Sequence, residues 1–188
     1  MIEKDAKIYG DLEKILVTKE QIAERIREVG KQITEDYAGK SPVMVCILKG
    51  AVVFFSDLAR EIDLPLTMEF MAVSSYGSAT KTSGVVRVLK DLDNDILNRD
   101  VIIVEDIVDS GVTLNYIRSM LQHRGAATLK IVALLDKPER RKVPDLKVDY
   151  TCFDIPDEFV VGYGLDFDQR YRNLPDIGVL SPRIYGDA

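Results

Sequence analysis

The sequence predicts an α/β domain with a mainly parallel central sheet flanked by helices. Near-continuous apolar runs at Val43–Leu48, Val101–Val104 and Thr128–Asp136 are typical of strands buried on both faces. Segments with helical periodicity alternate with these runs, which is the pattern of a parallel sheet with crossover helices. The chain has 188 residues, of which 46% are hydrophobic and 30% charged, so it is long enough for one domain with a sizeable core.

The first part of the chain predicts an edge strand followed by a long helix. Residues Asp11–Val17 alternate between polar and apolar, as the residues of an edge strand do. Thr18 has the character of a helix N-cap, and Gln21, three residues later, completes a capping box. The helical period then extends to about Tyr37 through Ile22, Ile26, Val29 and Ile33.

The middle part continues this alternation. Gly50 ends the first buried strand, and Val52–Arg60 has the pattern of a helix. A second strand is predicted at Leu66–Val73 and a returning strand at Val85–Lys90. Between them, Ser74–Gly84 is polar, small and without periodicity, so we expect a mobile loop there.

The strand at Val101–Val104 leads into a predicted helix at Thr113–Arg124, with Gly125 just past its end. From about Lys137 onward prolines are frequent: Pro138, Pro144, Pro156, Pro175 and Pro182. Because proline interrupts both helices and central strands, we expect short strands and loops folded over one edge of the sheet.

Charge and cysteine usage narrow the classes of function. The net charge of −6 argues mildly against nucleic acid as the main partner, because binding to phosphate backbones needs clustered Lys and Arg. Cys46 and Cys152 stand among apolar residues without a CxxC motif, which argues against structural zinc and for buried thiols. The sequence shows no secretory signal and no apolar run approaching the ~18 residues of a membrane span, so we expect a cytoplasmic location.

In the segment Val101–Leu114, VIIVEDIVDSGVTL, a predicted buried strand is followed directly by acidic and small residues. Ligands of an open parallel sheet lie beyond the carboxyl ends of the strands, which is where Glu105 and Asp106 are expected. The stretch Asp109–Thr113 then opens the next helix. Its backbone N–H groups, its hydroxyls and the helix dipole together predict a phosphate cradle.

The two acids beside this cradle would repel a bare phosphate. They are explained if they accept hydrogen bonds from sugar hydroxyls, or if they face a magnesium ion that also binds a polyphosphate. The pattern therefore predicts a phosphorylated sugar with free hydroxyls as ligand. The alternative is that Glu105, Asp106 and Asp109 are solvated acids that merely cap the helix.

The same segment resembles the 5-phosphoribosyl 1-diphosphate motif of the type I phosphoribosyltransferases. ILKGA resembles their pyrophosphate loop, SSYGSATKTSG their flexible lid, and IPDEFVVGYGLDFDQRYRNLPDIGVL the C-terminal hood of the hypoxanthine-guanine branch in its short bacterial form. The resemblance covers most of the chain and implies the type I phosphoribosyltransferase fold. It implies a single domain over residues 1–188, with a core at about 11–136 and a hood formed by about 137–188 together with the N-terminal segment.

The resemblance also implies roles for the residues around the sugar. Glu105 and Asp106 would hold the ribose 2′ and 3′ hydroxyls. The loop of Asp109, Ser110, Gly111, Val112 and Thr113 would wrap the 5′-phosphate, with Val112 at a position where relatives vary and backbone makes the contact. Asp109 would in addition lie near N7 of the purine and handle a proton, if it is within hydrogen-bond reach.

The pyrophosphate would be bound by Lys49, Gly50 and Arg172, and family members hold the peptide before the lysine in a cis form in some states. Magnesium is the implied cofactor. Its candidate ligands are Glu105, Asp106 and Asp166, the last either directly or in the outer shell. Ser75 and Tyr76 would belong to the lid that closes over the site.

Four residues are implied for the purine: Lys137, Phe159, Val160 and Asp166. Lys137 would donate to the 6-oxo group, Phe159 would stack on the base, and Val160 would offer backbone contacts. A lysine donor matches an oxo acceptor and faces the amino group of adenine badly, so 6-oxopurines are the expected substrates. Arg141 also lies near the site in the family, although KPERRK also fits a solvated basic turn.

The implied activity is purine salvage by a pentosyltransferase. The enzyme would transfer the phosphoribosyl group from 5-phosphoribosyl 1-diphosphate to N9 of hypoxanthine or guanine and form IMP or GMP and pyrophosphate. A homodimer or homotetramer is the family habit, with no nucleic-acid or membrane partner. Two rivals stay open at this point: a non-catalytic regulator of this fold that binds nucleic acid, and a phosphosugar-binding module without catalysis.

Overall fold

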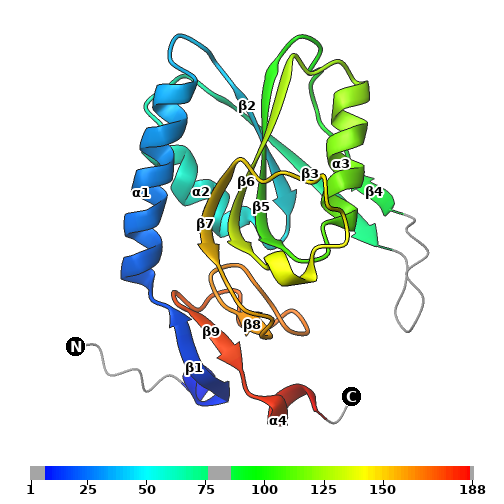
Figure 1. Cartoon of the computed structure of the whole chain (residues 1–188). Coiled ribbons are helices and arrows are strands. Elements are labelled where there is room, and N and C mark those ends of the chain that lie inside the picture. The colour runs from blue at the N-terminus through cyan, green and yellow to red at the C-terminus, as the bar shows by residue number, and fades with distance from the viewer. Residues whose placement is uncertain (1–6, 76–85, 187–188) are drawn as a thin grey trace.

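The computed structural model describes residues 7–75 and 86–186. Six strands form the central sheet in the order β4-β3-β2-β5-β6-β7 (Figure 1), and all pairs are parallel except β3 with β4. The strands are β2 (Val43–Leu48), β3 (Thr67–Ser75), β4 (Val86–Lys90), β5 (Asp100–Val108), β6 (Thr128–Asp136) and β7 (Tyr150–Asp154). This confirms the predicted mainly parallel sheet.

Helices cover both faces of this sheet. α1 (Lys19–Asp36) and α2 (Val52–Glu61) lie on one face, and α3 (Val112–His123) lies on the other (Figure 1). The side chains of β2 alternate accordingly: Met44 and Cys46 belong to the core under α1 and α2, and Val45 belongs to the core under α3. Burial on both faces explains why the central strands are apolar at almost every position.

A second, smaller sheet lies below the carboxyl ends of the central strands and forms the hood (Figure 1). It pairs β1 (Leu12–Val17), β9 (Ile177–Leu180) and β8 (Val160–Val161) antiparallel in the order β1-β9-β8. A 3₁₀ turn, η1 (Lys7–Asp11), precedes it, and α4 (Pro182–Tyr185) follows it. Within the segment expected to form the hood, β7 instead extends the central sheet.

Most predicted helices and strands begin and end within a few residues of the observed ones. The side chain of Thr18 accepts from the backbone of Gln21 and the Gln21 side chain accepts from the backbone of Thr18, which confirms the capping box. Cys46 and Cys152 are buried free thiols, as expected. None of the helices in the described ranges combines the length and apolar character that a membrane-crossing segment needs.

Two boundaries differ from prediction by more than one residue. Ser74 and Ser75, assigned to the loop, are the last residues of β3, where they pair with β4. The strand predicted at Val101–Val104 continues to Val108, because β6 keeps pairing with it as far as Val108 and Asp136. Residues 76–85, which hold most of the predicted lid, lie outside the described part of the chain.

Candidate active site

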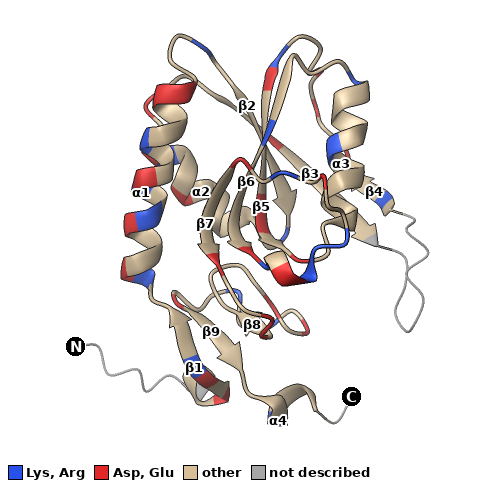
Figure 2. Ribbon diagram, viewed as in Figure 1, with Lys and Arg blue, Asp and Glu red and all other residues tan. Residues whose placement is uncertain are grey.

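Charged residues of both signs occur in the segments where the carboxyl ends of the central strands face the hood (Figure 2). The acids Glu105 and Asp106 belong to β5 itself, which corrects the expectation that they follow its end. On one side β5 still pairs with β6, whereas its pairing with β2 stops at Val104. The sheet therefore opens beside the two acids, so they still border a space at the rim.

The loop between β5 and α3 forms the predicted cradle. Gly111 is the N-cap of α3 with φ of 77°, a left-handed conformation that favours glycine. The hydroxyl of Ser110 accepts from the N–H of Val112 at 3.5 Å. A cavity of about 210 Å³ opens here, lined by Glu105, Ile107, Val108, Asp109, Ser110, Gly111, Thr113 and Leu114. The start of a 12-residue helix faces it, which suits an anion.

The two acids are poorly satisfied in the protein alone. Oε2 of Glu105 is enclosed and has no hydrogen-bond partner among the described residues. Burial, and then the neighbouring Asp106 carboxylate, raise the pKa of Glu105 well above its usual value. Burial also raises the pKa of Asp106 to about 6, although the N–H of Ile107 donates to its Oδ1 at 2.8 Å. A ligand that brings hydroxyls or a cation would supply the missing partners.

The β2–α2 loop lies against these acids. The Leu48–Lys49 peptide is cis, which agrees with the expectation from the resemblance. Gly50 lies so near Asp106 that an added Cβ would stand 1.5 Å from its Oδ2. A Cβ added at Gly164, from the hood, would stand 2.1 Å from the carbonyl oxygen of Gly50. Segments far apart in the sequence therefore meet at this point.

The same hood segment carries an ion pair. Arg172 contacts Oδ1 of Asp166 at 2.7 Å and donates to the carbonyl oxygen of Gly164 at 2.7 Å. The charges of Arg172 and Asp166 both act on the pKa of Asp106, which places them near the acid pair. Lys49 is exposed and donates to Oε1 of Gln169 at 3.3 Å. Lys49 precedes Gly50, which lies against Asp106, and Arg172 bonds Gly164, which lies against Gly50, so both cations belong to segments that meet at the acids.

The fit to a metal ion depends on what the ligand brings. In residues 7–75 and 86–186 no three His, Cys, Asp or Glu side chains stand close enough together to hold a metal ion by themselves. Glu105, Asp106 and Asp166 are therefore not a preformed cage. Glu105, whose Oε2 has no partner among the described residues, and the adjacent Asp106 fit a magnesium ion that takes further ligands from a polyphosphate and water, which is how this ion commonly binds.

Lys137, which is implied to contact the purine, is a buried residue next to the phosphate loop. Lys137 is 7% exposed, and its Nζ donates to the carbonyl of Glu158 at 2.7 Å and to Asp157 at 3.4 Å. Its backbone N–H donates to the carbonyl of Val108 at 2.9 Å, which fixes it beside the start of the phosphate loop.

Phe159 is 41% exposed, and its ring contacts Phe167 edge-on at 5.8 Å and Tyr185 at 5.1 Å between centroids. Val160 follows as a buried residue of β8. An exposed aromatic ring held by other rings is suited to stacking on a flat base. Of the lid residues, Ser75 ends β3, and Tyr76 lies outside the described residues.

Arg140 is a residue that the sequence did not single out. Its Nε lies 2.5 Å from Oδ1 of Asp109, and its Nη1 lies 3.0 Å from Oδ2 of Asp157. The run KPERRK showed a basic turn but not which cation would reach the acids. The neighbouring Arg141 donates to the carbonyl of Leu146 at 3.0 Å and pairs with Asp136 at the end of β6. Its side chain also packs against Gly111 of the cradle.

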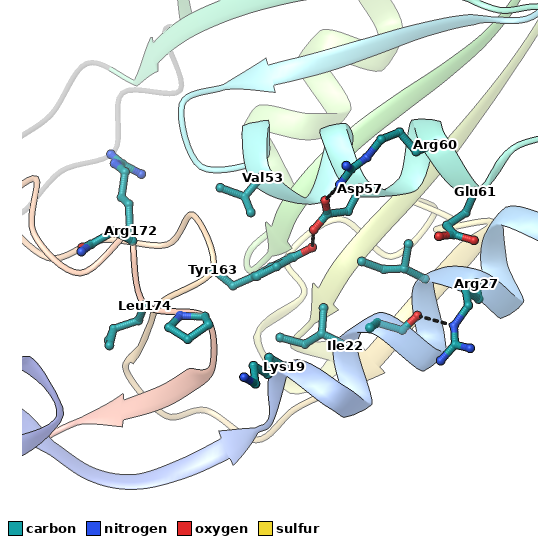
Figure 3. Close-up of a pocket in the computed structure, with 14 residues that line it drawn as sticks. Lys19, Ile22, Arg27, Val53, Asp57, Arg60, Glu61, Tyr163, Arg172 and Leu174 are labelled. Atoms are coloured by element: carbon teal, nitrogen blue, oxygen red, sulfur yellow. Dashed lines mark hydrogen bonds and ion pairs between the residues drawn. The ribbon is translucent and has the colours of Figure 1, made fainter. Parts of the chain in front are cut away.

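A further cavity, of about 550 Å³, lies between α1, α2 and the hood (Figure 3). Its cations already have acidic partners: Lys19 with Glu20, Arg27 with Glu24, Arg60 with Asp57, and Arg172 with Asp166. Such a lining does not by itself indicate an anionic ligand.

Known proteins resemble this chain over nearly its whole length. Residues 14–168 match the model of the phosphoribosyl transferase domain. The hypoxanthine-guanine phosphoribosyltransferase of Streptococcus thermophilus (strain ATCC BAA-250 / LMG 18311) is 52% identical over 185 residues, which cover 98% of this chain and 99% of that protein. The enzyme of the same name from Bacillus subtilis is 50% identical, with coverage of 93% and 97%. The crystal structure of a hypoxanthine phosphoribosyltransferase from Staphylococcus aureus superposes with a TM-score of 0.94 at 49% identity, covering 97% of this chain and 99% of that one.

Proposed function

The chain belongs to the phosphoribosyltransferase family, and we propose that it transfers a 5-phosphoribosyl group from 5-phosphoribosyl 1-diphosphate to N9 of hypoxanthine or guanine. It is a pentosyltransferase of purine salvage. The observation that carries this proposal is the likeness to enzymes of this name over both the core and the hood. Nothing in the fold or the comparisons favours a non-catalytic, nucleic-acid-binding regulator.

The sugar phosphate is bound by β5 and the start of α3. The 5′-phosphate occupies the cradle of Asp109 to Thr113, where backbone N–H groups at the start of α3 and two hydroxyls serve as donors. Glu105 and Asp106 accept hydrogen bonds from the ribose hydroxyls. These bonds relieve two acids that have too few partners in the ligand-free protein.

The pyrophosphate binds between Lys49, Gly50 and Arg172. The close approach of Gly50 to Asp106 supports this assignment, since it brings the backbone of this loop beside the ribose acids. As the bond between C1′ and the pyrophosphate oxygen breaks, negative charge grows on the leaving group. Lys49 and Arg172 would stabilise this charge, because a fixed cation lowers the energy of negative charge that grows beside it.

Magnesium is the proposed cofactor. Glu105 and Asp106 are neighbours on β5, and the charge of Asp166 on the hood acts on the pKa of Asp106. These acids, directly or through water, would hold the ion, which when bound supplies positive charge to the pyrophosphate. A cation and hydroxyl donors are the two classes of partner that these buried carboxylates can accept.

The purine lies between Phe159 and the ribose. Lys137 donates to its 6-oxo group, and the backbone at Val160 borders its edge, with Asp166 beyond. N9 attacks C1′ and the base loses a proton, for which Asp109 is the candidate acceptor through N7. The lid implied at Ser75 and Tyr76, of which Tyr76 lies outside the described residues, would exclude water, because hydrolysis would destroy the activated sugar.

We also propose a cytoplasmic location and self-association as a dimer or tetramer. Both cysteines are free thiols, as is usual in a reducing compartment. Large apolar side chains are exposed on neighbouring elements, Val52 on α2 and Met68 on β3, and they support association. Light scattering on an eluting column peak would give the mass of the assembly.

The test is turnover with magnesium, 5-phosphoribosyl 1-diphosphate and, separately, hypoxanthine, guanine, xanthine and adenine, followed by ultraviolet absorbance. We expect nucleotide from hypoxanthine or guanine, none from adenine, loss of the reaction without magnesium, and strong loss in Asp109→Ala. Binding of the sugar diphosphate without turnover of any base would contradict the proposed activity and would favour the phosphosugar-binding module without catalysis.

A further inference from the structure

A single guanidinium joins two acids from separate segments of the chain, one in the phosphate loop and one shortly before β8. Arg140 contacts Asp109 in the phosphate loop at 2.5 Å and both oxygens of Asp157 at 3.0 and 3.2 Å. Asp157 in turn accepts from Lys137, at 3.4 Å. The contacts form a continuous chain, Asp109–Arg140–Asp157–Lys137, which we call the carboxylate bridge.

The backbone fixes the position from which Arg140 reaches these acids. Lys137 and Arg140 are separated by one tight 3₁₀ turn, η2 (Pro138–Arg140), in which the N–H of Arg140 donates to the carbonyl of Lys137 at 3.0 Å. The backbone N–H of Lys137 is tied to the carbonyl of Val108, next to Asp109. Both ends of the bridge are therefore anchored by hydrogen-bonded backbone.

Arg140 carries the geometry that such a bridge requires. An arginine presents several N–H donors in a rigid fork and can hold two carboxylates at once, whereas an ammonium group binds as a point charge. An ordinary exposed ion pair contributes little, because solvent screens it. This guanidinium differs in that both of its acids adjoin proposed purine contacts: Asp109 itself and the Asp157 partner of the buried Lys137.

We propose that Arg140 is a positioning residue for the purine, whose guanidinium holds Asp109 and, through Asp157, Lys137 at the separation that the base requires. The proposal rests on the proposed function, because it takes Asp109 and Lys137 as purine contacts. Arg140 itself need not touch the base. Its loss leaves both groups in place but free to move apart, so the purine must order them when it binds.

The consequence is a split between the two substrates. The purine is bound between the ends of the bridge, so binding of the purine should weaken when the bridge is removed. The sugar diphosphate depends on the β5 acids, the α3 N-terminus and the pyrophosphate loop, none of which contacts Arg140 apart from Asp109. Its binding should change little.

The test is steady-state kinetics of Arg140→Gln on the full chain with each substrate varied in turn. We expect the KM for hypoxanthine to rise about tenfold, with kcat and the KM for 5-phosphoribosyl 1-diphosphate within about twofold of the parent, as loss of a partly exposed charge-assisted pair implies. Arg140→Lys should recover part of this loss, because it keeps the charge but reaches one acid. The matched control is Lys142→Gln, which removes an exposed cation two residues after Arg140 and should leave all constants unchanged.

A double-mutant cycle tests the connection itself. Asp157→Asn should also raise the KM for hypoxanthine. The KM of the double variant with Arg140→Gln should not exceed the higher of the two single-variant values, since both changes break one bridge. If Arg140→Gln fails to fold, as judged by its melting curve, the lysine variant carries the test with a rise of about threefold.

Several results would overturn the bridge. These are an unchanged or lowered KM for hypoxanthine, equal rises for both substrates, a fall in kcat alone, or additive effects in the cycle. If the parent chain itself fails to convert hypoxanthine or guanine, the proposed function fails, and the bridge fails with it. If the parent is active and the variants have the same constants as the parent, the bridge is overturned and the proposed function stands.

Discussion

Glu105 and Asp106 link the binding of ligand to the stability of the protein. Burial raises the pKa of Asp106 from its ordinary value of 3.8 to about 6, and it raises the pKa of Glu105 well above 4.5. A carboxyl group whose pKa is higher in the folded state binds its proton more tightly there. Folding is therefore favoured at pH below about 4, and that contribution is lost as the pH rises through 6.

We expect Asp106→Asn to stabilise the ligand-free protein at pH 8 and to abolish most activity. A neutral amide does not carry the penalty of a buried charge, and a shift of about two pKa units corresponds to at most about 3 kcal/mol. Urea unfolding at pH 8 and at pH 5 measures the difference, which should shrink at the lower pH. The exposed Glu139→Gln serves as control. An equal gain at both pH values, or a loss at pH 8, would show that burial does not govern this acid.

At the scale of an element, the β2–α2 loop shows how closely backbone segments approach in the site. An added Cβ at Gly50 would stand 1.5 Å from Oδ2 of Asp106 and 2.6 Å from its Cγ. The side chain of Asp106 would have to move, because it points from a strand that is paired with β6 on both sides of it. This position therefore requires glycine for reasons of space.

We expect Gly50→Ala to reduce kcat/KM by about a hundredfold, since displacement of a reacting group's neighbours by an ångström carries an effect of that order. The overpacking should also lower the free energy of unfolding by about 1 to 3 kcal/mol. Kinetics and a melting curve measure both. Gly10→Ala is the control, since nothing lies within 4 Å of a Cβ added there. Parent-like kinetics for Gly50→Ala would mean that the loop stands farther from the acids.

The elements also show what the sequence could predict. Apolar runs are local signals, so β2, β5 and β6 were located from the sequence, as was α1 with its cap. The end of β5 was wrong, because its length depends on pairing with β6, which a local pattern does not contain. The register of β1 on β9, with Leu12 opposite Leu180, joins the two ends of the chain and has no local signal.

The candidate site follows the same rule. Glu105, Asp106 and the small residues after them form a contiguous motif, so their grouping could be predicted from spacing. Lys137, Phe159 and Arg172 came from the family resemblance, since each alone has the appearance of an ordinary surface or core residue. Arg140 escaped notice because its role depends on the direction of one side chain within a basic turn.

At the scale of the whole molecule, the hood must be held in place on the core. Asp176, 1% exposed, accepts from the backbone of Lys19 at 2.9 Å and from the hydroxyl of Tyr9 at 2.7 Å. On the side of the larger cavity, the hydroxyl of Tyr163 donates to Asp57 on α2 (Figure 3). These bonds fix the segment from Gly164 to Arg172 against the pyrophosphate loop.

Tyr163→Phe removes the attachment to α2 while the ring stays packed. We expect the free energy of unfolding to fall by about 1 kcal/mol, the usual net value of one hydrogen bond, because Asp57 keeps Arg60 as a partner. We also expect kcat/KM to fall several-fold, since Asp166 and Arg172 are carried by the segment that the tyrosine anchors. The control is Tyr116→Phe, which alters an exposed tyrosine on α3, 42% accessible. Loss of stability without loss of activity would mean that the hood is positioned for catalysis by Asp176 and the packing of β1 on β9, and that the contact with α2 only adds strength to the fold.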